Sequence, residues 1–175
     1  MKRWTALALL FVGLVSVDQW TKQIAVAELM ARPAIRMLGD MFRLQYAENR
    51  GGFLSFGADF SHPARFLVFV VLSSIGLAVL AWIGFRQRPV DRKQAYGFTM
   101  ILAGGASNLF DRIANGGYVI DFLNVGVGPL RTGVFNIADM AILFGTGLLL
   151  WDHFFRKRPE SAPEETTDAG TTETE

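Results

Sequence analysis

This chain contains long apolar segments, which restrict the folds open to it. A membrane-spanning helix needs roughly 17 to 25 mostly apolar residues, and four segments meet this requirement. They cover approximately residues 4–24, 64–85, 96–113 and 133–155. Because 51% of the 175 residues are hydrophobic, a water-soluble domain is the weaker interpretation. We therefore predict an all-α membrane protein with four transmembrane helices.

The first apolar segment has an alternative interpretation as a cleaved signal peptide. Lys2 and Arg3 precede its apolar core, and the Ala-Val-Ala sequence at positions 25–27 resembles a cleavage site. Asp18 and Lys22 interrupt the approach to that site, which favours a helix that stays in the membrane.

Basic residues cluster on one side of the four predicted spans. Short loops rich in Lys and Arg stay in the cytoplasm, and the clusters lie at positions 2–3, 86–93 and 156–158. The opposite loops carry arginines that are spread more thinly. We therefore expect both termini in the cytoplasm, a membrane domain over residues 1–158 and an acidic, disordered cytoplasmic tail over residues 159–175.

The two loops on the outer side contain short strand-like runs. Phe42, Leu44 and Tyr46 alternate with polar residues in the first loop, and residues 118–123 form a second run that follows a Gly-Gly pair. We predict that the two runs join in a small sheet on the outer surface.

Polar residues interrupt three of the predicted spans at a similar depth. Placing an ionisable side chain within a bilayer costs free energy, so each such residue is expected to have a structural or functional role. Residues three or four apart share a helix face, and small residues at 104–107 would let the third helix approach its neighbours closely. Ion pairing alone is an alternative explanation for Asp18 with Lys22 and for Asp111 with Arg112. The residues in these polar stripes are Asp18, Lys22, Asn108, Asp111, Arg112, Asn136 and Asp139.

Asp121 and Asp139 differ from the other acids because neither has a basic neighbour in the sequence. Two such carboxyl groups in contact would share one proton instead of both ionising. This state suits an aspartic peptidase, in which one carboxylate activates water and the protonated partner polarises the peptide carbonyl. Acids within a membrane also serve proton and ion pathways. These residues alone are therefore compatible with two other functions, a proton-coupled transporter and a scaffold that catalyses no reaction.

Several other chemistries lack the residues that they require. The chain has no cysteine, which excludes disulfides, thiolate metal sites and a cysteine nucleophile. It also has no Gly-x-Ser-x-Gly and no His-Glu-x-x-His motif. We expect neither a metal nor a cofactor, and no nucleic-acid binding, because the basic residues lie at membrane edges, where they set topology.

Five segments together resemble, in order, the motifs of the lipoprotein signal peptidases, also called signal peptidase II. The ordered set is far more specific than any one of its members. The segments are Asp18-Gln19-Trp20-Thr21-Lys22, Asn49-Arg50-Gly51-Gly52-Phe53-Leu54-Ser55, Gly104-Gly105-Ala106-Ser107-Asn108-Leu109-Phe110-Asp111-Arg112, Val119-Ile120-Asp121-Phe122 and Phe135-Asn136-Ile137-Ala138-Asp139.

This resemblance implies four membrane helices with an extracytoplasmic β-cradle, in a monomeric aspartic endopeptidase of the bacterial inner membrane. The implied catalytic pair is Asp121 and Asp139, near the outer leaflet. The partners of the enzyme would be membrane lipids and its substrate, a prolipoprotein whose lipobox cysteine carries diacylglycerol. The substrate would be cut just before that cysteine. The residues expected to shape the site or hold substrate are Asp18, Lys22, Asn49, Gly51, Asn108, Asp111, Arg112 and Asn136.

One position departs from the family pattern. Family members usually have a small residue followed by Phe before the Ser, whereas this chain has Phe53 and Leu54 before Ser55. The change predicts a different local shape in the cradle, and neutral variation within a lipid-facing turn is the alternative. Neither explanation affects the catalytic pair.

Overall fold

The structure is a computed structural model, and it describes residues 3–51, 57, 59–86 and 91–155. The segment Phe53-Leu54-Ser55 and the acidic tail at 159–175 lie outside the described residues. The helices are α1 Arg3–Leu29, α2 His62–Phe66, the π-helical η2 Leu67–Leu72, α3 Ser73–Arg86, α4 Arg92–Ala114 and α5 Ile137–Phe155. The strands are β1 Ile35–Met37, β2 Phe42–Asn49, β3 Val119–Val127 and β4 Leu130–Arg131.

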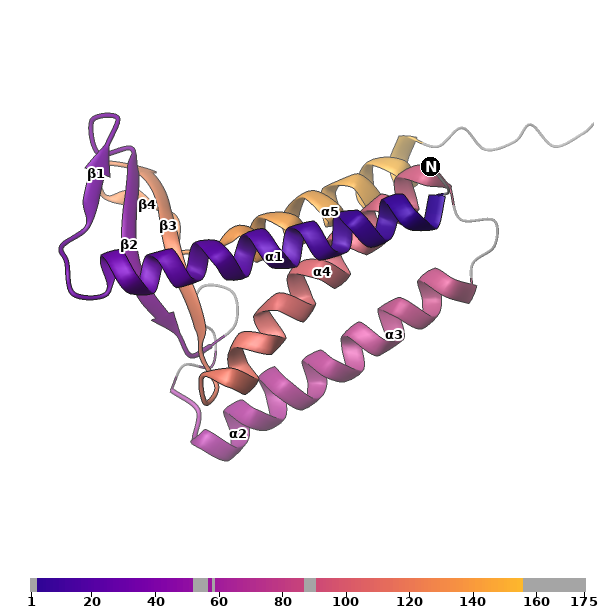
Figure 1. Cartoon of the computed structure of the whole chain (residues 1–175), viewed down its shortest axis with the longest axis horizontal. Helices are drawn as coiled ribbons and strands as arrows, with labels where there is room; N and C mark the ends of the chain where they lie inside the picture. The colour runs from indigo at the N-terminus through magenta and orange to yellow at the C-terminus, as the bar shows by residue number, and fades with distance from the viewer. Residues whose placement is uncertain (1–2, 52–56, 58, 87–90, 156–175) are drawn as a thin grey trace, which may run out of the picture.

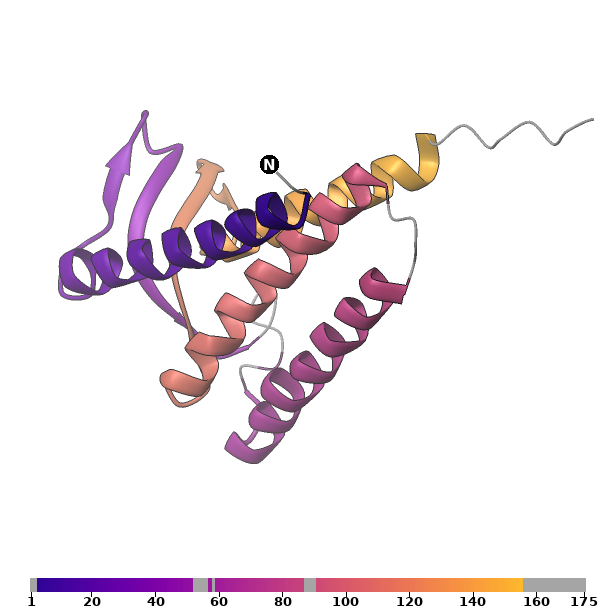
Figure 2. The same ribbon diagram turned by 45° about the vertical axis from the view of Figure 1, so that its right-hand side comes forward.

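The helices form a bundle with the sheet at one end of it (Figures 1 and 2). α4 contacts α5 most extensively and also packs against α1 and α3, so it is the central helix. α2, η2 and α3 follow one another directly as one long helical segment. The start of α1 and the end of α5 lie at the end of the bundle away from the sheet (Figure 1). The two loops that were expected on the outer side therefore meet at one end of the molecule.

A helix occupies each of the four predicted spans. α4 covers the third span over 23 residues but is not among the helices that are apolar enough, by length and composition, to cross a membrane. The three helices that meet this condition are Arg3–Leu29, Pro63–Gly84 and Ile137–Phe155.

The last helix begins later than the sequence predicted. α5 starts at Ile137 and not at Gly133. Phe135 first pairs with Leu123 of β3 in an antiparallel bridge, so the chain is still extended at this point. The helix can begin only after this pairing with the sheet ends.

The outer surfaces of the helices are apolar. Trp4, Trp82 and Trp151, which lie near the end of the bundle away from the sheet, are 57–59% exposed. Many Leu, Ile, Val and Phe side chains along the same helices are also exposed. Tryptophan favours the boundary between lipid and water, and an exterior of this kind is stable in a bilayer.

The four strands form one antiparallel sheet in the order β1-β2-β3-β4. Its central pair, β2 and β3, comes from the two predicted strand-like runs, so that prediction is confirmed. A small apolar core joins the sheet to the bundle and contains Ala25 and Leu29 of α1 with Phe122 and Leu123 of β3. Burial of each large side chain in such a core stabilises the fold by about 1.5–3 kcal/mol.

A one-residue shift in register within β2 turns Asn49 toward the face of the sheet that carries Asp121. Leu44 lies opposite Leu123, and Asn49 lies opposite Val119. Opposed residues share a face and side chains alternate along a strand, so Asp121 shares its face with Leu123 and Val119. Leu44 and Asn49 are five positions apart and would face opposite sides of a regular strand. The extra residue of the bulge brings both to the Asp121 face.

Candidate active site

Asp121 lies within β3, and its side chain is held from both sides. The residue is 1% exposed. Its Oδ2 accepts a hydrogen bond of 3.0 Å from Nδ2 of Asn49 on β2, and its Oδ1 accepts one of 2.7 Å from Nδ2 of Asn136. The neighbouring strand and the segment before α5 therefore fix the position of this carboxyl group together.

Asp139 lies in the first turn of α5, where it forms a capping box with Asn136. Oδ1 of Asn136 accepts the backbone N–H of Asp139 at 2.8 Å, and Oδ2 of Asp139 accepts the backbone N–H of Asn136 at 3.3 Å. The other carboxyl oxygen of Asp139 accepts a hydrogen bond of 2.8 Å from Nδ2 of Asn108 on α4. Reciprocal capping fixes the helix start and places the acid at the positive end of the helix dipole.

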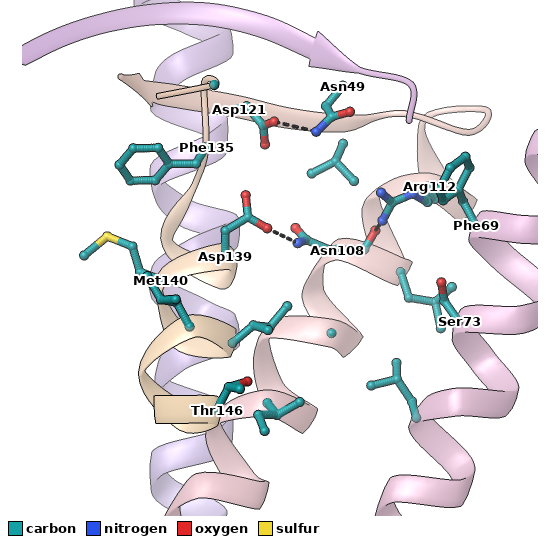
Figure 3. Close-up of a pocket in the computed structure, with 18 of the residues that line it drawn as sticks. Asn49, Phe69, Ser73, Asn108, Arg112, Asp121, Phe135, Asp139, Met140 and Thr146 are labelled. Carbon is teal, nitrogen blue, oxygen red and sulfur yellow. Dashed lines mark hydrogen bonds between the residues drawn. The ribbon is translucent and has the colours of Figure 1, made fainter. Parts of the chain in front are cut away.

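The side chains of Asp121 and Asp139 line the same cavity (Figure 3). This cavity has a volume of about 870 Å³ and is lined by residues of η2, α3, α4, α5 and the sheet. Asn49, Asn108 and Arg112 line it beside the two acids, and most of the remaining lining is apolar. The cavity therefore has a polar end near the sheet and an apolar body along the helices. Within the part of the chain that the structure describes, no group of three or more His, Asp or Glu side chains is arranged to hold a metal ion.

The environment of Asp121 favours its protonated form. Burial, and after it the charge of Asp139, raises the pKa of Asp121 from an ordinary value of 3.8 to about 7. The amide hydrogen bonds from Asn49 and Asn136 and the charge of Lys22 act in the opposite direction. At neutral pH a carboxyl group with this pKa exchanges its proton readily, as an acid or base in catalysis must.

Three charged residues form a buried ionic cluster behind the acid pair. Nζ of Lys22 on α1 lies 2.6 Å from Asp18 and 2.9 Å from Asp111 of α4, and none of the three side chains is more than 2% exposed. The Asp18–Lys22 pair follows the spacing of four residues expected from the sequence. Asp111 pairs with Lys22 across the helix interface and not with its neighbour Arg112, because adjacent residues on a helix point in different directions.

The ionic cluster also joins α1 to β3 and α5. Oδ1 of Asp18 accepts the backbone N–H of Ala138 at 2.8 Å, and its Oδ2 accepts the hydroxyl of Ser107 at 2.7 Å. Oδ2 of Asp111 accepts the backbone N–H of Ile120 at 3.2 Å. The cluster therefore holds the starts of β3 and α5, the two elements that carry the acids, at fixed positions on α1 and α4.

Asn108 connects the ionic cluster to the acid pair. Its Oδ1 accepts hydrogen bonds from Nζ of Lys22 at 3.0 Å and from Nδ2 of Asn136 at 3.1 Å. Its Nδ2 donates to Asp139, as described above. One amide therefore contacts the buried cation, the capping residue of α5 and one of the two acids.

Arg112 holds the first outer loop against α4. Its Nη2 donates a hydrogen bond of 2.9 Å to the backbone oxygen of Gly51, and its Nη1 donates one of 3.3 Å to the backbone oxygen of Asn108. The guanidinium group also lies 5.5 Å from the ring centre of Phe69 on η2 (Figure 3). The structure thus places all the site residues singled out from the sequence around the cavity or directly behind it.

Some residues at the site were not predicted. Nε2 of Gln19 donates to Oδ1 of Asp111 at 2.7 Å and to the hydroxyl of Ser107 at 2.9 Å. The position of Ser107, four residues before Asp111 on the same helix face, was a usable signal for Ser107. Phe69 lies in a purely apolar stretch, so its sequence carries no sign of the contact with Arg112.

Glycine at position 104 allows α4 and α5 to approach closely enough to bring their polar residues together. A Cβ atom at Gly104 would lie 2.3 Å from the backbone oxygen of Ala138 and 2.8 Å from the side chain of Ile142. This confirms the expectation that small residues on this helix permit close packing.

The apolar helices and the small sheet are those of a membrane protein, and its sequence matches a known family. A family model described as signal peptidase (SPase) II matches residues 10–155. The chain therefore belongs to the signal peptidase II family and is a membrane protease.

Individual relatives agree with this family over most of their length. The lipoprotein signal peptidase of Pseudoalteromonas translucida is 35% identical over 160 residues, which cover 90% of this chain and 91% of that protein. The lipoprotein signal peptidase of Desulforapulum autotrophicum is 30% identical over 154 residues, which cover 88% of this chain and 94% of that protein. Two solved structures, each described as a bacterial membrane enzyme, share the fold with TM-scores of 0.75 and 0.74 at 22% and 20% identity. The similarity covers 90% and 87% of this chain and 95% of each solved chain.

Proposed function

We propose that this protein is an aspartic endopeptidase that removes signal peptides from diacylglyceryl-modified prolipoproteins, cutting just before the lipidated cysteine. The observation that carries this proposal is that Asp121 and Asp139 line one cavity, each held by side-chain amide donors. Relatives named lipoprotein signal peptidase support the class of substrate.

Catalysis requires the two acids to act in different protonation states. One carboxylate accepts a proton from water as the water oxygen attacks the carbonyl carbon of the scissile peptide. The protonated partner donates a hydrogen bond to the carbonyl oxygen, and the tetrahedral intermediate collapses when a proton reaches the leaving nitrogen. The raised pKa of Asp121 supports a pair that holds one proton near neutral pH.

The cavity suits a substrate that carries lipid. The acids and amides at its polar end would meet the peptide bond, and the apolar body along the helices would take acyl chains. A diacylglyceryl group next to the scissile bond would therefore be bound without leaving the bilayer. The apolar lining residues on the helices include Leu77, Leu80, Ile101, Leu109, Ile142 and Leu143.

We propose that α4 crosses the membrane with the other three helical segments. α4 packs against α1, α3 and α5, so much of its surface faces protein and not lipid. Its buried residues are small or polar, which accounts for its lower hydropathy. They are Ala95, Gly97, Ala103, Gly104, Ser107, Asn108 and Asp111.

Four spans would place both termini in the cytoplasm of a bacterial inner membrane and the sheet on the outer side. The basic residues near the end of the bundle away from the sheet support this orientation. The buried contacts of Asp18 and Lys22 with α4 and α5 support the retention of α1 as a membrane helix.

The orientation can be tested with single cysteines, because the natural chain has none. Leu38 is 79% exposed at the tip of the sheet, and Lys93 is exposed at the start of α4. A membrane-impermeant maleimide added to intact spheroplasts should label Leu38→Cys and should label Lys93→Cys only after the membrane is opened. Labelling of Lys93→Cys in intact spheroplasts would contradict the orientation.

The substrate class can be tested with two forms of one precursor. The purified protein in detergent is incubated with a diacylglyceryl-modified prolipoprotein and with the same precursor before modification. We expect release of the signal peptide from the modified form alone, with the new N-terminus at the lipidated cysteine. Equal cleavage of both forms, or cleavage at another bond, would refute the proposed specificity.

A further inference from the structure

Three asparagines surround the two acids, and each amide oxygen accepts a hydrogen bond from a group that can only donate. The oxygen of each amide must face that group, so the NH₂ end of each amide is available to a carboxyl group. The three pairs are Asn49 with the backbone N–H of Gly51 at 3.1 Å, Asn136 with the backbone N–H of Asp139 at 2.8 Å, and Asn108 with the ammonium group of Lys22 at 3.0 Å.

Only one of these three donors is a side chain. The orientation of Asn49 and Asn136 depends on backbone N–H groups, whereas that of Asn108 depends on two side chains, the ammonium group of Lys22 and the amide of Asn136. Nδ2 of Asn108 donates to Asp139 at 2.8 Å, so Lys22 and Asp139 lie at the two ends of one amide group. Without the ammonium group, the oxygen of Asn108 would keep only the hydrogen bond of 3.1 Å from Nδ2 of Asn136, an amide group that also donates to Asp121, and the amide of Asn108 would be held less firmly in this orientation.

We propose that Lys22 is a positioning residue for the acid pair, because it fixes the amide of Asn108 in the orientation that donates to Asp139. The proposal rests on the function proposed above, since it takes Asp121 and Asp139 as the reacting pair. Lys22 acts through Asn108 in this role and needs no contact with the substrate. Its complete burial and its two ion pairs hold the ammonium group in place.

The role predicts a change in pH dependence that general damage to the fold would not produce. The charged side chains that act on the pair are Asp18 and Lys22 from α1 and Arg112 from α4, and Asp111 of α4 is paired with Lys22. The charge of Lys22 lowers the pKa of Asp121. Removal of Lys22 takes away this charge and releases the amide donor of Asn108. Both changes favour the protonated pair, so the pH optimum of cleavage should rise.

The experiment compares Lys22→Met with Gln19→Met. Gln19 contacts the same ionic cluster through Asp111 and Ser107, and it serves as the matched control for disturbance of that cluster. Cleavage of a lipid-modified precursor is measured over a range of pH. For Lys22→Met we expect kcat to fall about tenfold or more with little change in KM. We expect its pH optimum to rise by about half to one unit, while that of Gln19→Met stays at the wild-type value.

Lys22→Met leaves Asp18 and Asp111 without their cation and can therefore prevent folding. Two further variants test the proposal in that case. Lys22→Met combined with Asp111→Asn preserves the net charge of the cluster, so its pH optimum should still rise by the part that comes from the amide of Asn108. Asn108→Leu removes the amide and leaves all three charged residues in place, and its pH optimum should rise by the same part.

An unchanged pH optimum in the folded Lys22 variant, or in Asn108→Leu, would overturn the proposal. Asp121→Asn and Asp139→Asn are measured in parallel. Cleavage by either of these would refute the proposed function itself. If both are inactive and only the pH optimum fails to move, the positioning role alone is wrong.

Discussion

Asn136 donates a hydrogen bond of 2.7 Å from its side-chain amide to the carboxyl group of Asp121. The same residue caps α5, since its amide oxygen accepts the backbone N–H of Asp139 at 2.8 Å. One asparagine therefore connects the acid on the strand to the acid on the helix. The geometry of the site depends on where α5 begins as much as on how the helices pack.

Asn136→Ala and Asn136→Ser should separate the two roles of this residue. Serine can still cap the helix, whereas alanine cannot, and neither can donate an amide hydrogen bond to Asp121. We expect the alanine variant to have a free energy of unfolding about 1 kcal/mol below that of the serine variant. Both should cleave more slowly than the wild type. Unfolding in detergent measures the first effect, and equal stability of the two variants would show that the cap contributes nothing.

The raised pKa of Asp121 predicts a pH-dependent stability. Its value of about 7 in the folded state, against an ordinary 3.8, means that the folded protein binds this proton more tightly than the unfolded chain does. The resulting stabilisation is fully present below about pH 4 and is lost as the pH rises through about 7. The free energy of unfolding of the wild type should therefore fall over this range relative to that of Asp121→Asn, which does not titrate. A difference that grows in the opposite direction would contradict the raised pKa.

Gly104→Ala should destabilise the contact between α4 and α5. The new Cβ atom would overlap the backbone of α5 at Ala138, and overpacking of this kind costs about 1–3 kcal/mol. Gly147→Ala on α5 is the matched control, because a Cβ atom there meets nothing within 4 Å. We expect a lower unfolding temperature and slower cleavage for Gly104→Ala, and neither for Gly147→Ala. Identical behaviour of the two variants would refute close packing at Gly104.

Much of this fold follows from local patterns in the sequence. Apolar length predicts the helices, and alternation predicts the central pair of strands. Spacing of four residues predicts the ion pair of Asp18 with Lys22, which the structure has at 2.6 Å. Each of these features depends on residues close together in the chain, and so periodicity is enough to find them.

Local patterns of this kind do not predict contacts between segments that are distant in the sequence. The sequence does not show that Lys22 reaches Asp111 and Asn108, because spacing along one helix says nothing about the facing helix. The start of α5 was placed too early for the same reason, since Phe135 is held by a strand pairing with Leu123. The shift in register that turns Asn49 toward the acids also depends on the partner strand.

Catalysis by the two acids is tested by the cleavage of a diacylglyceryl-modified prolipoprotein by purified Asp121→Asn and Asp139→Asn. Asp152→Asn is the control, because Asp152 is buried near the end of α5 that is opposite to Asp139 and accepts a hydrogen bond from Gln94. We expect the control to release the signal peptide and both site variants, although folded, to release none. Normal cleavage by either folded site variant would contradict catalysis by this pair of acids.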